Sequence, residues 1–146
     1  MQILLLNGPN LNLLGTREPE IYGSKSLDDI ITELGNFASS LHVDLQHLQS
    51  NHEGVLIDRI HQAKIDGTQG IVINPGGLTH SSVSLRDAIS SVDLPTVEVH
   101  LSNIHARESF RKLSYVAGVA LGQISGFGAK GYELAIEAIR DYLSRK

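Results

Sequence analysis

A polar segment at residues 7–23, NGPNLNLLGTREPEIYG, holds several side chains that can bind or react with a small molecule. Asn10 offers a carboxamide, Arg17 a planar cation, and Tyr22 a phenol five residues later. Glycines and prolines recur through the segment, so we expect turns rather than a long helix. An apolar run at residues 3–6 precedes it, and open α/β sheets bind ligands in loops at the carboxyl ends of their strands. The alternative is a surface loop rich in turn formers.

Two later apolar runs also end in polar side chains. Asn74 ends the run GIVIN and is followed by His80, and His100 ends the run PTVEVH. The carboxyl ends of parallel strands share one edge of a sheet, so these groups are expected to converge with the segment at residues 7–23. Glu98 lies two positions before His100 and therefore on the same face of its strand. We expect Glu98 to orient His100 and to favour its protonated form.

The pattern of apolar residues predicts the elements that position these groups. Strands are expected at residues 2–7, 42–49, 70–74, 95–100 and, more weakly, 116–125, and helices at 26–41, 53–66, 81–92 and 132–143. Ser26 and Asp29 predict a capping box at the first helix. On the second helix one side is expected to carry Val55, Ile57, Ile60 and Ala63. This alternation predicts an α/β fold, a flavodoxin-like doubly wound five-stranded parallel sheet of order 2-1-3-4-5 with helices on both faces.

Length and composition narrow the class of protein. The chain has 146 residues, which suits a single catalytic domain over residues 1–146. Its 12 Lys and Arg against 16 Asp and Glu disfavour a nucleic-acid partner. The absence of cysteine excludes disulfides and thiolate metal sites. The first apolar run is four residues long without a basic region before it, so we expect no signal peptide, no membrane segment and a cytoplasmic location.

Several common sites lack their sequence motifs. The chain has no GxxxxGK[ST] loop, no GxGxxG after the first strand and no GxSxG elbow, so nucleotide sites and serine hydrolases have no support. A phospho-acceptor module of this fold would need carboxylates where Asn7 and Asn74 stand. A metal centre is also disfavoured, because no i, i+4 helical spacing relates His80, His100 and His105.

Three blocks of the sequence resemble the type II 3-dehydroquinate dehydratases. They are residues 7–23, INPGGLTHSSVSLRDAI at 73–89, and EVHLSNIHARESFR at 98–111, and the resemblance extends from Met1 to the terminal helix. It implies a flavodoxin-like fold without metal or cofactor, assembled as a homododecamer of four trimers. It also implies a hydro-lyase of the shikimate pathway and of quinate breakdown. The reaction is the reversible elimination of water from 3-dehydroquinate to 3-dehydroshikimate through an enolate.

The resemblance assigns the chemical roles. Tyr22 is implied as the base, His100 as the general acid, and Asn10 as the group that positions a water on the enolate oxygen. A phenol with an ordinary pKa near ~10 needs roughly 3–4 kcal/mol to become a base at neutral pH. One guanidinium at ~4 Å and an effective dielectric of ~20 supplies about that much, and Arg17 and Arg107 are the candidates. The stretch that carries Arg17 and Tyr22 is expected to close over the substrate.

The resemblance also implies the substrate contacts. The substrate carboxylate is expected on the backbone N–H groups of Leu101 and Ser102, aided by Asn74. His80 and Arg111 are expected to hold ring hydroxyls.

Asp87 is implied to reach the site of a neighbouring subunit. Pattern alone leaves alternatives, with Asp87 and Arg111 as solvated helix charges and Ser102 as a cap of the following turn. For the whole chain, the alternatives are a non-catalytic small-molecule-binding module or a flavin carrier on the same fold. A binding module has no use for a phenol flanked by arginines, which favours the enzyme.

Overall fold

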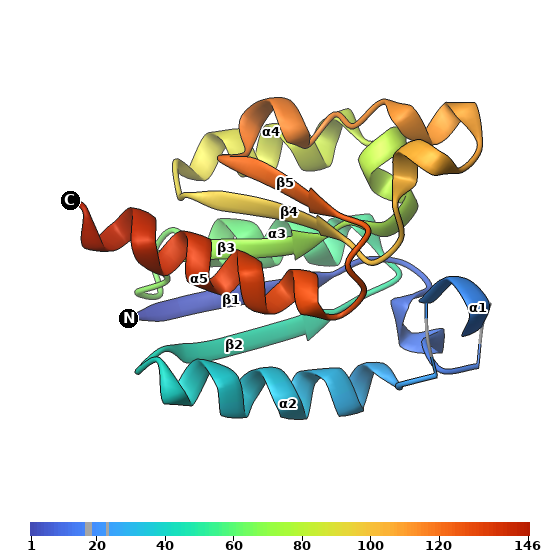
Figure 1. Cartoon of the computed structure of the whole chain (residues 1–146). Helices are drawn as coiled ribbons and strands as arrows, with labels where there is room; N and C mark the ends of the chain where they lie inside the picture. The colour runs from blue at the N-terminus through green and yellow to red at the C-terminus, as the bar shows by residue number, and fades with distance from the viewer. Residues whose placement is uncertain (17–18, 23) are drawn as a thin grey trace.

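Five parallel strands form one sheet in the order β2-β1-β3-β4-β5, as the sequence predicts (Figure 1). The computed structural model describes residues 1–16, 19–22 and 24–146, and only the backbone of residues 19 and 22. The strands are β1 Gln2–Asn7, β2 Asp44–Gln49, β3 Gly70–Asn74, β4 Thr96–His100 and β5 Gly122–Ser125. The helices are α1 Pro19–Tyr22, α2 Leu27–Ser40, α3 Glu53–Ala63, α4 Val83–Val92 and α5 Lys130–Ser144.

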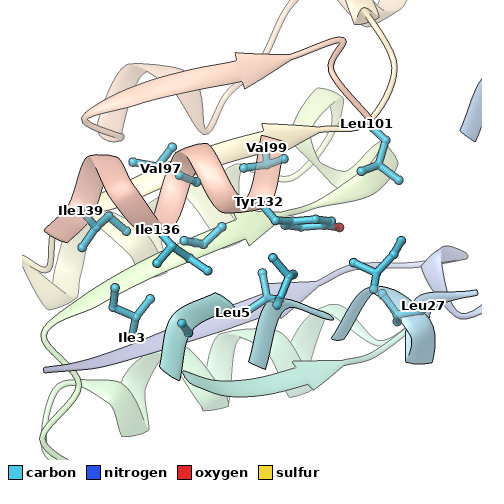
Figure 2. Close-up of a cluster of buried hydrophobic side chains, with 14 of the residues drawn as sticks. Ile3, Leu5, Leu27, Val97, Val99, Leu101, Tyr132, Ile136 and Ile139 are labelled. Atoms are coloured by element: carbon cyan, nitrogen blue, oxygen red, sulfur yellow. The ribbon is translucent and has the colours of Figure 1, made fainter. Parts of the chain in front are cut away.

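The sheet is covered on both faces, because successive strand side chains point to opposite sides. Ile3 and Leu5 of β1 pack with α2 and α5, whereas Leu4 and Leu6 pack with α3 and α4. Figure 2 shows the first of these two clusters, with α5 lying over the strands. A strand buried on both faces reads as a continuous apolar run, which is why β1 was predictable to the residue.

The first helix begins as predicted and ends in a tight turn. Ser26 Oγ accepts a hydrogen bond from the N–H of Asp29, and the Asp29 carboxylate accepts one from the N–H of Ser26, which confirms the capping box. The following strand begins at Asp44, not at residue 42 as predicted. His42 has φ 58°, and the N–H of Val43 donates to the carbonyl of Ala38, so residues 42–43 close the helix instead of joining the sheet.

The second predicted helix has its apolar side rotated from the expected one. Leu56, Ile60 and Ala63 are fully buried, whereas Val55 is 42% exposed. The buried stripe follows the spacing i, i+4, i+7, and Val55 falls beside it. The helix ends at Ala63 rather than at residue 66, and Gly67 completes the turn with φ 94°. Among the described residues, no helix is long and apolar enough to cross a bilayer.

The fifth strand is shorter than predicted. The pattern indicated a strand over residues 116–125, but Ala117–Val119 forms a 3₁₀ turn and only Gly122–Ser125 is extended. The N–H of Leu121 donates to the carbonyl of Thr96, and this bond joins the chain to β4.

Short 3₁₀ turns, which the sequence did not predict, follow three strands at the carboxyl edge of the sheet. They are η1 Leu11–Leu13 after β1, η2 Gly76–His80 after β3, and η3 Ile104–Ala106 and η4 Ser109–Lys112 after β4. The first two connections meet at Gly8, whose N–H donates to the carbonyl of Asn74. A Cβ at position 8 would lie 2.3 Å from the carbonyl oxygen of Pro75, so only glycine fits there.

Candidate active site

A pocket of about 150 Å³ opens at the carboxyl edge of the sheet, where the predicted site residues were expected to converge. Its lining includes Asn10, Asn74, His80, His100, Leu101, Ser102, Arg107 and Arg111. A wider hollow of about 740 Å³ adjoins it and shares Leu101, Ser102 and Arg107. Ile21 lines that hollow, so α1 borders the approach to the pocket.

His100 and Glu98 form a buried pair at the end of β4. The Nε2 atom of His100 lies 2.5 Å from Oε2 of Glu98. Both side chains lie on the sheet face that carries α3 and α4, because they are two residues apart on one strand. The predicted contact between them is therefore confirmed.

Glu98 is held from three directions. Besides His100, Thr79 Oγ1 donates to it at 2.6 Å, and Ser114 Oγ lies 2.9 Å from both carboxylate oxygens. Burial by itself raises the pKa of this carboxyl, but the hydrogen bonds from His100, Thr79 and Ser114 and the charge of His100 outweigh burial. The pKa of Glu98 is therefore held below its ordinary value, and the buried group is a carboxylate.

His80 forms the wall of the pocket beside His100. Its Nδ1 lies 2.7 Å from the carbonyl oxygen of Leu113. A carbonyl only accepts, so Nδ1 carries the proton and Nε2 of the neutral ring is left as an acceptor. The rings of His80 and His100 are stacked, with centroids 6.3 Å apart. The pocket thus has two imidazoles with different hydrogen-bond partners, a carboxylate for His100 and a backbone carbonyl for His80.

The turn after β4 presents backbone donors to the pocket. In the described part of the chain, no acceptor takes the backbone N–H of Leu101 or of Ser102. The turn is fixed by Ser125 Oγ, which donates to the carbonyl of Ser102 at 3.1 Å. Adjacent N–H groups of this kind suit an anion.

Two arginines supply positive charge to the same wall. Arg107 Nη1 donates to Ser102 Oγ at 3.2 Å, and Arg111 Nε donates to Glu108 Oε2 at 2.9 Å. Glu108 also lies 3.8 Å from Nε of Arg107, so one carboxylate contacts both guanidinium groups. The hydrogen bond with Arg111 is the largest cause that lowers the pKa of Glu108.

Asn10 reaches the pocket through an unusual backbone conformation. Its φ of 71° is left-handed, a region that asparagine enters more readily than most residues. Its N–H donates to Asn51 Oδ1 at 2.9 Å, and Gln49 Nε2 donates to the same oxygen at 3.1 Å. The end of β2 therefore holds the Asn10 turn at the mouth of the pocket.

Sequence and structure comparisons identify relatives of this chain. The family model for dehydroquinase class II matches residues 1–140. The chain belongs to the class II dehydroquinase family. It is 58% identical to the 3-dehydroquinate dehydratase of Polynucleobacter asymbioticus over 143 residues, 98% of this chain and 96% of that one. It is 60% identical to that of Gloeobacter violaceus over 146 residues, 100% of this chain and 91% of that one. The crystal structure of a type II dehydroquinase from Butyrivibrio crossotus superposes with a TM-score of 0.95 at 46% identity, covering 96% of this chain and 97% of that one.

Not every predicted residue of this class II dehydroquinase lines the pocket. Asp87 lies on α4, is mostly exposed, and accepts a hydrogen bond from Arg86 Nη1 at 2.8 Å. Glu98 sits behind His100 rather than at the surface of the pocket. Arg17 and the side chain of Tyr22 lie outside the described residues, as does the predicted closure of their stretch.

The supporting residues of this dehydroquinase pocket were missed by sequence reasoning. Thr79 stands next to His80, which was the only signal for it, and Ser114 gave none. Tyr132 of α5 hydrogen-bonds to Asn74, but in the sequence it reads as an apolar helix residue.

Proposed function

We propose that this class II dehydroquinase eliminates water from 3-dehydroquinate through an enolate, with the pocket at the end of β4 as its active site. The reaction needs a base for a proton next to the ketone, stabilisation of the enolate oxygen, and an acid for the departing hydroxyl. The observation that carries the proposal is the buried His100–Glu98 pair, because it provides an acid whose charged form has a fixed counter-charge.

His100 is the proposed general acid. Its Nε2 is engaged with Glu98, so Nδ1 is the nitrogen left to donate a proton to the leaving hydroxyl. The Glu98 carboxylate favours the imidazolium before this transfer. Glu98 is thus a positioning residue that acts through His100.

Tyr22 is the proposed base, with Arg17 and Arg107 favouring its phenolate. Asn10 is proposed to position the water that hydrogen-bonds to the enolate oxygen. Support for Asn10 comes from its place in the pocket lining and from its fixed turn.

The substrate carboxylate is proposed to bind the N–H groups of Leu101 and Ser102 together with Asn74. Support comes from their common pocket and from the absence of another acceptor for these N–H groups within the described residues. His80 and Arg111 are proposed to hold ring hydroxyls. The reaction so described uses protein groups and one positioned water, without metal or cofactor.

Asp87 is proposed to complete the pocket of a neighbouring subunit in a homododecamer of four trimers. Support comes from exposed apolar side chains that assembly could bury, namely Val83 on the same helix as Asp87, and Phe110 and Leu113 in and after η4. Light scattering should then give twelve times the 15.8 kDa chain mass. A fully active monomer would contradict the assembly.

We propose one catalytic domain and a cytoplasmic location. The sheet takes its strands from residue 2 to residue 125, and α5 packs on it, which supports a single unit over residues 1–146. The place of the reaction in the shikimate pathway supports the cytoplasm, and cell fractionation checks it.

Ultraviolet absorbance tests the function directly. On adding 3-dehydroquinate, we expect absorbance from the conjugated enone of the product. Tyr22→Phe should lower turnover by orders of magnitude with binding roughly retained, and Arg17→Lys should also be severely impaired. Tyr142→Phe, which changes a tyrosine outside the pocket, is the control. No enone from the folded wild-type protein would favour the alternative, a non-catalytic binding module.

A further inference from the structure

Tyr132 is a buried phenol for which the proposed reaction has no role. It lies in the first turn of α5 and is fully buried in the cluster between α5 and the sheet. In Figure 2 its ring lies among apolar side chains near Val99, with the hydroxyl at the end that points away from Ile136 and Ile139. Burial raises the pKa of Tyr132 well above its ordinary value, so the hydroxyl keeps its proton.

The hydroxyl of Tyr132 joins the ends of two neighbouring strands. It donates to Asn7 Oδ1 at 2.5 Å and accepts from Asn74 Nδ2 at 2.9 Å. Asn7 and Asn74 are register partners of β1 and β3, and their side chains point to the face that α5 covers. One hydroxyl therefore reaches both carboxamides.

These bonds fix which end of the Asn74 carboxamide faces each neighbour. The backbone N–H of Gly76 can only donate, and it points at Asn74 Oδ1 at 3.2 Å. Nδ2 must then face Tyr132, and the phenol must send its own proton to Asn7. The side-chain nitrogen Nδ2 of Asn74 carries two hydrogens. One is donated to Tyr132, and the other remains available to the pocket that Asn74 lines.

We propose that Tyr132 is a positioning residue that orients Asn74 so that its second amide N–H meets the substrate carboxylate. This inference rests on the proposed function, which assigns the carboxylate to Asn74. The substrate carboxylate is unchanged throughout the elimination. A contact with it therefore stabilises the bound ground state and the transition state by the same free energy. Losing the orientation therefore weakens binding without slowing the chemical step.

Tyr132→Phe removes the hydroxyl and keeps the ring. We expect KM for 3-dehydroquinate to rise about tenfold, the scale of one well-placed hydrogen bond, with kcat within about twofold of wild type. Tyr142→Phe, on the same helix but outside the pocket, is the matched control and should leave both constants unchanged. An unchanged KM in Tyr132→Phe overturns the inference, and so does a fall in kcat as large as the rise in KM.

A double-mutant cycle separates positioning from general loosening of the fold. Asn74→Ala should raise KM, and adding Tyr132→Phe to it should change KM no further. An equal rise in both backgrounds overturns the inference, since Tyr132 would then act without Asn74. If Asn74→Ala leaves KM unchanged, the carboxylate contact in the proposed function fails. If Asn74→Ala raises KM but Tyr132→Phe does not, the positioning role of Tyr132 is wrong while the carboxylate contact of Asn74 stands.

Asn7→Ala keeps the test decisive if Tyr132→Phe does not fold. It leaves the aromatic packing intact and removes only the acceptor that fixes the phenol proton. We expect KM to rise by a smaller factor, about threefold, with kcat retained. A folded Asn7→Ala protein with wild-type KM overturns the inference.

Discussion

The two sides of the pocket are built differently. The strand side, defined by Asn74, Glu98 and His100, is at most 5% exposed. Asn74 and Glu98 each have a partner from a distant part of the chain, Tyr132 and Thr79. The connector side, defined by Asn10, Arg107 and Arg111, lies in or beside short 3₁₀ turns. Among the described residues, its two arginines hydrogen-bond to Ser102 and Glu108, which lie within five positions along the chain.

This difference matches what each side has to do. Proton transfer needs a donor placed to within a fraction of an ångström, and a packed strand supplies that precision better than a loop does. A guanidinium acts over several ångströms, so a partly exposed turn can hold it. The pocket therefore places its proposed general acid on the packed side and its two arginines on the side built from turns.

The largest expected effect is on the strand side. His100→Gln keeps a hydrogen-bonding side chain of similar size but cannot donate a proton as an acid, so kcat should fall by about 10²–10⁴-fold. Steady-state kinetics measure this, and thermal melting confirms that the fold survives. If kcat falls less in His100→Gln than in an Arg111 variant, the strand side is not the more important side for the chemical step.

Glu98→Gln should change the pH dependence of turnover. The low pKa of Glu98 keeps it charged through the working range. In the proposed reaction that charge stabilises the His100 imidazolium. The proposed reaction needs an ionised Tyr22 and a protonated His100, so turnover should have a bell-shaped pH profile. Without the charge of Glu98, the basic limb, which reports loss of the His100 proton, should move to lower pH, and the acidic limb should move much less. Both limbs are measured for the two proteins in parallel. A basic limb that stays in place would reduce Glu98 to a structural partner.

The connector side should respond more weakly. Arg111→Lys keeps the charge but loses the planar fork, so KM should rise by roughly three- to tenfold while kcat changes little. Arg145→Lys, an exposed arginine at the far end of α5, is the control. If kcat falls with Arg111→Lys, Arg111 itself takes part in the chemical step.

The smallest expected effect concerns stability at high pH. The unfolded chain ionises Tyr132 near its ordinary pKa of 10.0, whereas burial holds the folded pKa higher. The phenol's contribution is complete below pH 10 and is lost as pH rises above it. Tyr132→Phe should therefore lose less stability than wild type between about pH 9 and 11. Urea unfolding at both pH values tests this, and equal losses would show that the phenol ionises in the folded protein.

Local sequence patterns were sufficient to predict most of the fold and the site residues at the strand ends. Asn74 and His100 end apolar runs, and Glu98 is related to His100 by the two-residue period of a strand, so each could be placed from nearby residues. Errors came where a local conformation interrupted the pattern, as at left-handed His42 and in the 3₁₀ turn before β5. Val55 was misplaced because an apolar residue beside the buried stripe looks the same in sequence.

Local patterns could not predict the residues that support the site from more distant parts of the chain. Ser114 reaches Glu98 across 16 residues, and Tyr132 reaches Asn74 across 58. No periodicity connects positions so far apart, and a tyrosine on the buried stripe of a helix usually indicates only core packing. Ser114 and Tyr132 can be identified as partners of the site only from the packed three-dimensional structure.

The bridge from Asn7 to Tyr132 spans 125 residues, which bears on how the protein is made. Helix α5 follows every strand of the sheet in the sequence, so the ribosome releases it after the rest of the pocket has been synthesised. Contacts of such long range form late, because loop closure must precede them. A nascent chain can therefore assemble much of its sheet before Asn74 acquires its final orientation, and substrate affinity should mature only when α5 has docked.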